Sequence, residues 1–222
     1  MTLARKDRLN VLGLLPLWRQ REAVAVADAA SGQNSGMADD WALLEAEIRA
    51  CTRCPLHATR LHAVPGSGDL QADWLIVGEA PGAEEDRQGE PFVGQAGLLL
   101  NAMLAAIALK RGEKVYIANI LKSRPPANRD PAPDEIMACL PYLERQIALI
   151  RPRIILALGR FAAQTLLGTD TPVSRLRGQV HTYQGLPLVV TYHPAYLLRT
   201  PADKGRAWAD LLLARRQLKD PQ

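Results

Sequence analysis

Residues 74–82 read Trp-Leu-Ile-Val-Gly-Glu-Ala-Pro-Gly, an apolar run that passes directly into a turn rich in glycine and proline. The apolar run predicts a buried strand over 74–77, and the turn residues predict where that strand ends. Further strands are predicted at 115–118, 153–158 and 186–192, and helices at about 41–49, 95–108, 133–149, 160–167 and 201–218. This alternation predicts an α/β fold in which helices cover a central, mainly parallel sheet of four strands.

The chain has 222 residues, 48% of them hydrophobic, which is enough apolar material for one buried core. We therefore expect one main domain over 41–219. Residues 1–26 are expected to form a basic extension, and 27–40, rich in Ala, Ser, Gly, Asn and Asp, are typical of a flexible linker. No apolar stretch reaches the length of about 20 residues that a membrane span requires.

Charge and cysteine content indicate the type of binding partner and the cellular compartment. Lysine and arginine number 27 against 23 aspartates and glutamates, with the excess near both termini and in 122–129. This excess suits a polyanionic partner such as nucleic acid, although charge alone does not prove one. The three cysteines form no even-numbered disulfide pattern, so we expect a protein of the reducing cytoplasm.

Polar motifs follow three of the four predicted strands. Gly78–Gly82 follows the first strand, Asn119 the second and His193 the fourth. Ligands of open parallel sheets bind beyond the carboxyl ends of the strands. We therefore expect the three motifs to converge on one crevice.

Each candidate side chain has a chemical and a structural interpretation. Phe92, between a proline and a glycine, is suited to stacking on a planar ring or to anchoring its loop in the core. Asn119 offers a donor and an acceptor that match an imide or amide edge, or it caps a strand. His193 is suited to donating a hydrogen bond to an oxygen that becomes negative, or to a structural hydrogen bond. Residues 196–199 form an apolar tip ending in a cation, the shape of a wedge that enters a base stack.

The cysteines indicate a second site. Cys51 and Cys54 lie one turn apart, and Cys139 lies far downstream. Two thiols at this spacing are typical of a soft metal site, whereas a free cysteine otherwise serves as a small core residue. Three ligands are one short of a closed metal site.

Taken together, the motifs resemble the iron-sulfur uracil-DNA glycosylases, often called family 4, over about residues 41–215. The stretches that carry this resemblance are GEAPG at 78–82, EED at 84–86, PFVG at 91–94, VYIANILK at 115–122, RPPANRDP at 124–131, ALGR at 157–160, LRG at 176–178 and HPAYLLR at 193–199. The resemblance implies a three-layer α/β/α sandwich with a 4Fe-4S cluster. It also implies a DNA repair hydrolase that flips uracil out of single- or double-stranded DNA and cleaves its N-glycosidic bond, leaving an abasic site. A monomer in a bacterial type of cytoplasm, associated with the nucleoid, is expected.

The resemblance implies a role for each candidate in uracil recognition. Phe92 stacks on uracil, Asn119 reads its imide edge, and His193 stabilises the charge on the leaving base. The whole substrate-binding set is Glu79, Ala80, Pro81, Phe92, Asn119 and His193. The expected DNA contacts are Lys122, Arg124 and Asn128 after the second strand, and Leu197, Leu198 and Arg199 in the wedge.

The sequence leaves open which group positions the attacking water. In related glycosylase families a side chain at the place of Ala80 helps to hold the water, and alanine has nothing to offer there. Stabilisation of the leaving base must then carry most of the catalysis, with Glu79 or Glu85 orienting the water.

The metal site departs from the family pattern. The family has a second cysteine pair sixteen positions apart, and counting back from Cys139 places Ser123 at the missing thiolate. Serine is a harder ligand than thiolate, so four states of the site stay open: a serine-ligated cluster, a three-iron form, a cluster with an outside ligand, and no cluster. The sequence also leaves open whether the serine is natural or introduced.

An alternative function is a catalytically silent, metal- or cluster-containing DNA-binding module of the same fold, related to domains of phage polymerases. The joint presence of Phe92, Asn119 and His193 at strand ends argues against it. A relative that links covalently to uracil-containing DNA through a loop histidine is disfavoured, because 120–133 contains no histidine.

Overall fold

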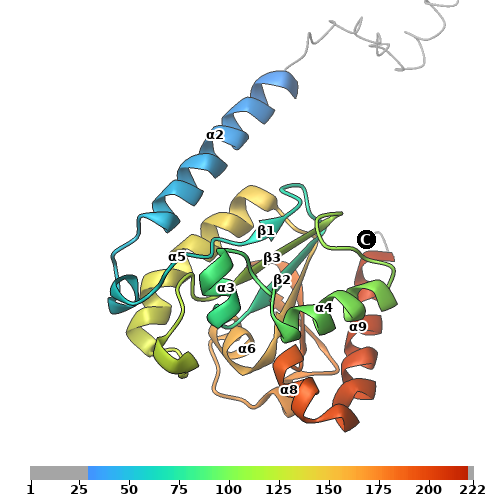
Figure 1. Ribbon diagram of the computed structural model, residues 1–222. Helices are drawn as coiled ribbons and strands as arrows, with labels where there is room; N and C mark the ends of the chain where they lie inside the picture. The colour runs from blue at the N-terminus through green and yellow to red at the C-terminus, as the bar shows by residue number, and fades with distance from the viewer. Residues whose placement is uncertain (1–29, 220–222) are drawn as a thin grey trace, which may run out of the picture. The chain divides into compact units, whose positions relative to one another are not determined.

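The computed structural model describes residues 30–219 (Figure 1). The basic extension expected over 1–26 lies outside the described residues. Helix α2 (Ala30–Arg49) takes in residues 30–40, so this part of the expected flexible linker is helical instead. The segment contains no proline, so no residue in it sterically blocks continuation of the helix upstream of the expected start at residue 41. The sheet lies within the compact unit Met37–Gln222.

The sheet has six strands in the order β1-β3-β2-β4-β6-β5. The four inner strands are parallel, as predicted: β2 (Trp74–Gly78), β3 (Val115–Asn119), β4 (Ile154–Leu158) and β6 (Leu186–Thr191). The prediction of four strands missed the antiparallel edges β1 (Ser67–Gly68) and β5 (Val180–Tyr183). β1 is two residues long and β5 is largely polar and part-exposed, so neither produces an apolar run.

The long helices lie close to where the sequence predicts them. They are α4 (Gln95–Ala106), α5 (Pro133–Ile150), α6 (Gly159–Leu167) and α9 (Lys204–Lys219). The short helices α3 (Ala83–Gln88), α7 (Val173–Leu176) and α8 (Pro194–Arg199), and the 3-10 turns η1 (Pro55–Ala58), η2 (Pro126–Asn128) and η3 (Pro201–Asp203), were not predicted. Within 30–219, no helix is both long and apolar enough to cross a membrane.

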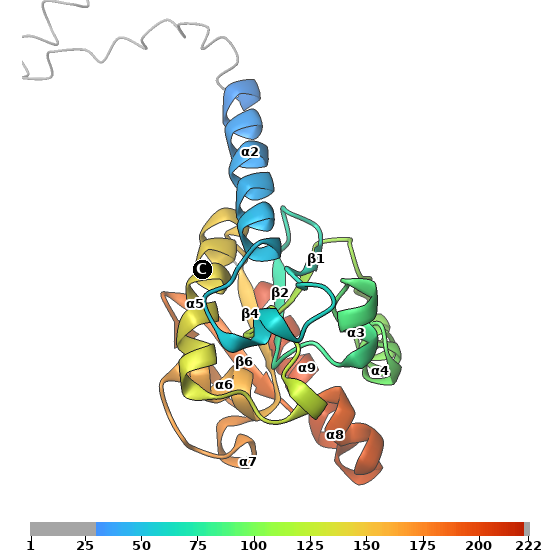
Figure 2. The ribbon, with the colours of Figure 1, turned by 60° about the vertical axis from the view of Figure 1, so that its left-hand side comes forward.

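Alternate strand residues enter two separate cores. Leu75 and Val77 of β2 pack with residues of α5 and α6, whereas Trp74 and Ile76 pack with residues of α4 and α9. Successive side chains of a strand point to opposite faces, so a sheet with both faces covered carries an unbroken apolar run. Figures 1 and 2 show these helix pairs on opposite sides of the sheet. The three-layer α/β/α sandwich is confirmed.

The strand order places a crevice at β2. The chain passes from β2 to its neighbour β3, then crosses back over β2 to reach β4 on the other side. Loops that leave neighbouring strands in opposite directions open a crevice beyond their carboxyl ends. The segment after β2 is Gly78–Gly82, and the residues after β4 are Gly159 and Arg160.

Candidate active site

A pocket of about 790 Å³ opens beyond the carboxyl ends of the parallel strands. It brings together the turn after β2, Asn119 at the end of β3 and His193 after β6, the three motifs predicted to converge, and it also takes in the loop after β3 and helix α8. The predicted residues that line it are Glu79, Ala80, Pro81, Glu85, Phe92, Asn119, Asn128, His193 and Arg199. Residues far apart in the sequence, from Glu79 to Arg199, therefore contribute to one concave site.

Gly78 allows two of these side chains to reach the pocket. A Cβ atom at Gly78 would lie 2.3 Å from Asn119 Oδ1 and 2.6 Å from the Phe92 ring, so any side chain would displace both. Asn119 is only 2% exposed, and its Oδ1 is a buried acceptor with no hydrogen-bond partner among the described residues. Unpaired buried acceptors are rare, and at a pocket wall such an atom is free to accept from a ligand.

The structure fixes the protonation of His193. The residue caps helix α8, and its Nδ1 accepts a hydrogen bond of 3.1 Å from the Ala195 N–H, so the neutral ring carries its proton on Nε2. Burial, and secondarily the Arg199 cation, lowers the pKa of His193 to about 4. At neutral pH His193 is therefore an uncharged donor through Nε2, with its ring centroid 5.5 Å from that of Phe92.

Gly159 is a site residue that the sequence interpretation left without a role. Its φ of +84° lies in the left-handed region, and a Cβ there would lie 2.8 Å from the His193 Cβ. The residue therefore makes room for the histidine against the end of β4. Gly159 directly follows a predicted strand, at the same edge of the sheet as His193, and this position could have identified it as a site residue.

Glu85 is engaged in holding the backbone, which corrects the prediction that it orients water. Its Oε1 accepts from the N–H groups of Val93 and Gly94 at 3.0 Å, and its Oε2 accepts from the Gly82 N–H at 3.1 Å. The carboxylate thus ties the turn after β2 to the turn that carries Phe92. These three hydrogen bonds fix the carboxylate in this bridging position.

Glu79 is the remaining acidic candidate in the pocket. Burial raises its pKa to about 7, the nearby Asp130 carboxylate adds to the rise, and the Arg160 cation opposes it. A carboxyl group that titrates near neutral pH is suited to accepting a proton from water, or to orienting water, under physiological conditions.

Charged residues at the pocket were missed by the sequence interpretation. Arg160 Nη2 pairs with Asp130 Oδ2 at 2.7 Å, and its guanidinium stacks on Phe161 at 4.3 Å from the ring centroid. Asp130, Arg160 and Phe161 all line the pocket. Arg160 is exposed and directly follows Gly159, so its place after a strand end was again the signal.

Two of the predicted DNA contacts are wrong. Lys122 is 2% exposed and donates to the Asn119 carbonyl oxygen at 2.8 Å and to Gln146 Oε1 at 2.7 Å, so its ammonium group cannot reach a phosphate. Leu197 is 1% exposed and packs in the core on the α4 and α9 side of the sheet. In the same wedge, Leu198 and Arg199 are exposed.

Arg124 and Asn128, also predicted as DNA contacts, lie in the loop after β3, where Arg124 is part-exposed and Asn128 is exposed. Arg124 Nε donates to Asn128 Oδ1 at 2.8 Å. Asn128 and its neighbour Ala127 both have positive φ angles, +55° and +53°. This bond and the left-handed backbone hold the loop in a tight turn beside the pocket.

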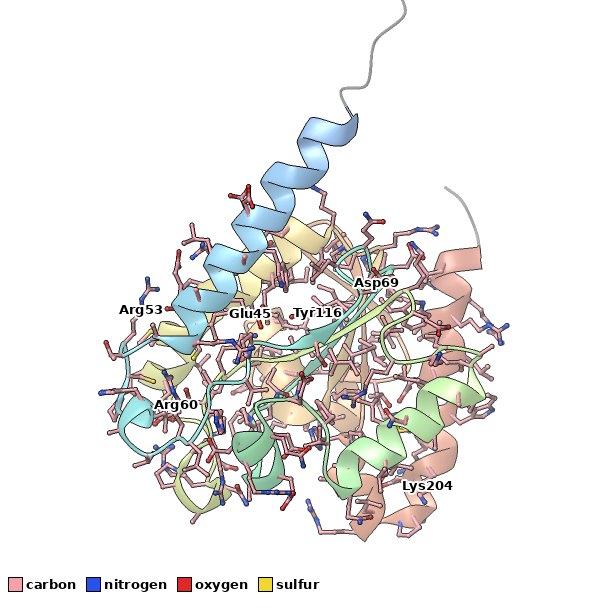
Figure 3. All side chains as sticks on the ribbon, turned by 45° about the horizontal axis from the view of Figure 1, so that its top comes forward. Glu45, Arg53, Arg60, Asp69, Tyr116 and Lys204 are labelled. Carbon is pink, nitrogen blue, oxygen red and sulfur yellow. The ribbon has the colours of Figure 1, made fainter. Side chains whose placement is uncertain are left out.

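The cysteines lie on segments that the fold brings together. Burial raises the pKa of the Cys139 thiol, whereas the Lys122 backbone and charge oppose the rise. Cys54 packs against the apolar cluster that contains Cys139. The Arg53 N–H contacts Cys51 Sγ at 3.5 Å. Arg53 lies on the segment that follows α2 (Figure 3). The described residues contain no three His, Cys, Asp or Glu side chains that converge on a single metal ion.

Ser123 is held next to the cysteine segment by Arg60. Arg60 Nη1 donates to Ser123 Oγ at 2.8 Å, and its Nη2 donates to the Cys51 carbonyl oxygen at 2.8 Å. Figure 3 places Arg60 on the same segment as Arg53. These two bonds place the Ser123 hydroxyl next to the backbone of Cys51, so the residue at the predicted fourth ligand position lies beside the cysteine segment.

Comparison with known proteins places this fold and pocket in one class. The sequence profile described as the uracil DNA glycosylase superfamily matches residues 65–212. The type-4 uracil-DNA glycosylase of Archaeoglobus fulgidus is 48% identical over 163 residues, covering 70% of this chain and 81% of the relative. That of Pyrobaculum aerophilum is 45% identical over 174 residues, covering 75% and 88%. A DNA polymerase of Bacillus phage SP01 is 33% identical over 136 residues, covering 61% of this chain and 15% of the polymerase.

A match over most of the domain, with an α/β/α sandwich and a pocket at the strand ends, defines a member of the uracil DNA glycosylase superfamily. Within that superfamily, the chain belongs to the type-4 uracil-DNA glycosylases.

Proposed function

We propose that the chain is a DNA repair hydrolase that flips uracil out of DNA and cleaves its N-glycosidic bond, leaving an abasic site for base excision repair. The relatives named type-4 uracil-DNA glycosylase support this activity. The observation that carries it is Asn119 Oδ1, which has no hydrogen-bond partner in residues 30–219 and is buried in one pocket with the Phe92 ring and the neutral His193 donor. Flipping costs a few kcal/mol, which these contacts offset.

The base is held by stacking and by its imide edge. Phe92 supplies the stacking face, and stacking of a base on an aromatic ring is worth roughly 1–3 kcal/mol. Asn119 Oδ1 accepts the hydrogen bond from the imide N–H of uracil, which satisfies the unpaired acceptor. Ala80 and Pro81 complete the pocket wall without adding a polar group from their side chains.

His193 stabilises the leaving group. As the glycosidic bond breaks, its electron pair moves to the base, and negative charge develops on a carbonyl oxygen of uracil. His193 Nε2–H donates to that oxygen, and because the imidazole has a pKa of about 4 it acts as a neutral hydrogen-bond donor. The His193 ring needs no reorganisation, since Nδ1 is already held by the Ala195 N–H.

Glu79 orients the attacking water. Ala80 offers no side-chain group for this, and the Glu85 carboxylate is occupied by three backbone N–H groups. The Glu79 carboxyl group lines the pocket and has a pKa of about 7, so a large fraction is ionised at neutral pH. Orientation of the water by a general base contributes about 100-fold to 10,000-fold to such a rate.

The DNA strand is contacted around the pocket mouth. Leu198 fills the gap left by the flipped base, and Arg199, Arg124 and Asn128 contact phosphates. Leu198, Arg199 and Asn128 are exposed, and Arg124 is part-exposed. Single- or double-stranded DNA is the partner, bound by a monomer in the cytoplasm at the nucleoid.

Cys51, Cys54 and Cys139 would hold a 4Fe-4S cluster, with Ser123 at the place of the fourth ligand. When bound, the cluster supplies a structural link between the segment after α2, the loop after β3 and helix α5. The packing of Cys54 against the apolar cluster that contains Cys139, and the Arg60 bonds to Ser123 and Cys51, support this placement. The chain's own contribution to the site is the burial of Cys139 and of Ser123.

A strand-cleavage assay tests the activity. The protein is incubated with oligonucleotides that carry one uracil, thymine or cytosine, single-stranded and paired, and abasic sites are then cleaved with alkali. Cleavage at uracil alone is expected. Binding without cleavage, by protein shown to be folded, would contradict the proposal and favour the silent DNA-binding module.

A further inference from the structure

The turn that carries Phe92 has a backbone conformation that requires support. Phe92 has a φ of +54°, in the left-handed region that a bulky residue rarely adopts. Its side chain is buried, so the ring and the strained backbone are fixed together. Such strain persists only where the surrounding structure holds it, and it is concentrated at functional sites.

Arg111 holds the carbonyl side of this turn. The residue lies between α4 and β3, where its Nη1 donates to the Pro91 carbonyl oxygen and its Nη2 to the Phe92 carbonyl oxygen, both at 2.7 Å. Its Nε donates to Asn101 Oδ1 on α4 at 3.3 Å. A guanidinium presents its donors in a fixed plane, so one side chain sets the direction of two successive carbonyl groups.

The opposite side of the turn is held by Glu85, whose Oε1 accepts from the N–H groups of Val93 and Gly94. Helix α4 closes the remaining side, because a Cβ at Gly97 would lie 1.8 Å from the Phe92 carbonyl oxygen. The turn is therefore held from two sides: the Arg111 guanidinium donates hydrogen bonds to its carbonyl groups, and the Glu85 carboxylate accepts hydrogen bonds from its N–H groups.

We propose that Arg111 is a positioning residue for uracil excision, which fixes the Phe92 ring at the place where it stacks on the flipped base. This rests on the proposed stacking role of Phe92. Arg111 is absent from the described residues that line the pocket, so it acts on the base only through the turn. A loop cation between α4 and β3 thereby becomes part of the base-recognition machinery.

The expected effect is on binding of the base. Without the guanidinium, the left-handed Phe92 backbone relaxes for part of the time, and the apparent affinity falls in proportion to the fraction of molecules that keep the stacking conformation. Strain of this kind would lower the fraction of molecules in the stacking conformation by about tenfold to hundredfold when the guanidinium is removed. Once a base is correctly bound, its cleavage proceeds at nearly the original rate.

A double-mutant cycle on the full chain tests the proposal. Arg111→Gln, Phe92→Ala and the double variant are compared by single-turnover excision and by inhibition with free uracil. Arg111→Gln is expected to raise the half-saturating concentration and the uracil inhibition constant together, by about tenfold to hundredfold. In the Phe92→Ala background the same change is expected to cost less than about threefold.

Three further variants separate positioning from general stability. Arg111→Lys, which keeps the charge but not the fork, is expected to recover part of the loss. Lys110→Gln, next in sequence but exposed and paired with Glu113, is the matched control and is expected to leave both constants unchanged. Asn101→Ala removes only the bond that orients Arg111 Nε, so it gives a smaller shift in the same direction even if Arg111→Gln fails to fold.

Three results would overturn the proposal. An equal loss from Arg111→Gln in the wild-type and Phe92→Ala backgrounds would mean that Arg111 does not act through Phe92. An unchanged uracil inhibition constant in both Arg111→Gln and Asn101→Ala would mean that neither contact supports base binding. If Phe92→Ala itself has no effect, the stacking role fails and the role of Arg111 falls with it.

Discussion

Replacing Asn119 by alanine separates function from stability in this protein. In most proteins, deleting a buried asparagine breaks hydrogen bonds and lowers stability. Asn119 Oδ1 has no hydrogen-bond partner among the described residues, so its removal breaks no hydrogen bond within the described protein. Asn119→Ala removes that atom, and we expect the Tm to stay unchanged or to rise.

The same change removes the acceptor for the imide N–H of uracil. Loss of this acceptor leaves the imide N–H of the bound base unpaired, which costs about 1–3 kcal/mol, or roughly tenfold to a hundredfold in kcat/KM. We therefore expect kcat/KM for uracil excision to fall by roughly that factor, and inhibition by free uracil to weaken. The measurement combines single-turnover excision with thermal unfolding.

Gln71→Ala, in an exposed turn before β2 and outside the pocket lining, is the matched control and is expected to change neither quantity. The reasoning is refuted if Asn119→Ala keeps kcat/KM within about threefold of the wild type. It is also refuted if activity falls only in proportion to a lowered Tm, because Asn119 would then be an ordinary structural residue.

Three other predictions follow from single features. The excision rate should rise with pH through about 7, because ionisation of Glu79 produces the carboxylate that orients water, and Glu79→Gln should be slower and flat over this range; a slope that survives in the variant would exclude Glu79. Ser123→Cys should raise the iron content by elemental analysis and raise the Tm, and unchanged iron would show that Ser123 is not the missing ligand. Ala127→Gly should stabilise the protein against urea by roughly 1 kcal/mol, since alanine at φ +53° is strained; a lower midpoint would contradict this.

The fold was predictable where the sequence has long apolar runs. All four inner strands are such runs, because both faces of the sheet are covered and every side chain of β2, β3 and β4 is buried. The edge strands β1 and β5 lack this pattern because they are short or part-exposed. Six-residue helices such as α3 and α8 are too short for a clear period.

The site was predictable where chemistry follows a strand end. Asn119 and His193 met this condition, and both line the pocket. Lys122 and Leu197 failed because sequence does not show which side of a loop or short helix faces the core. The hydrogen bonds of Arg111 to the Phe92 turn join residues that are 19 and 20 positions apart, and no local sequence pattern predicts such a contact.

The central claim is that the pocket at the strand ends takes a flipped uracil and releases it as a free base. Chromatographic measurement of free uracil, after incubation with an oligonucleotide that carries one deoxyuridine, tests this most directly. We expect one uracil released per strand, an intact abasic backbone, and strongly reduced release by Asn119→Ala. Uracil that stays in the strand, or equal release by wild type and Asn119→Ala, would contradict the account.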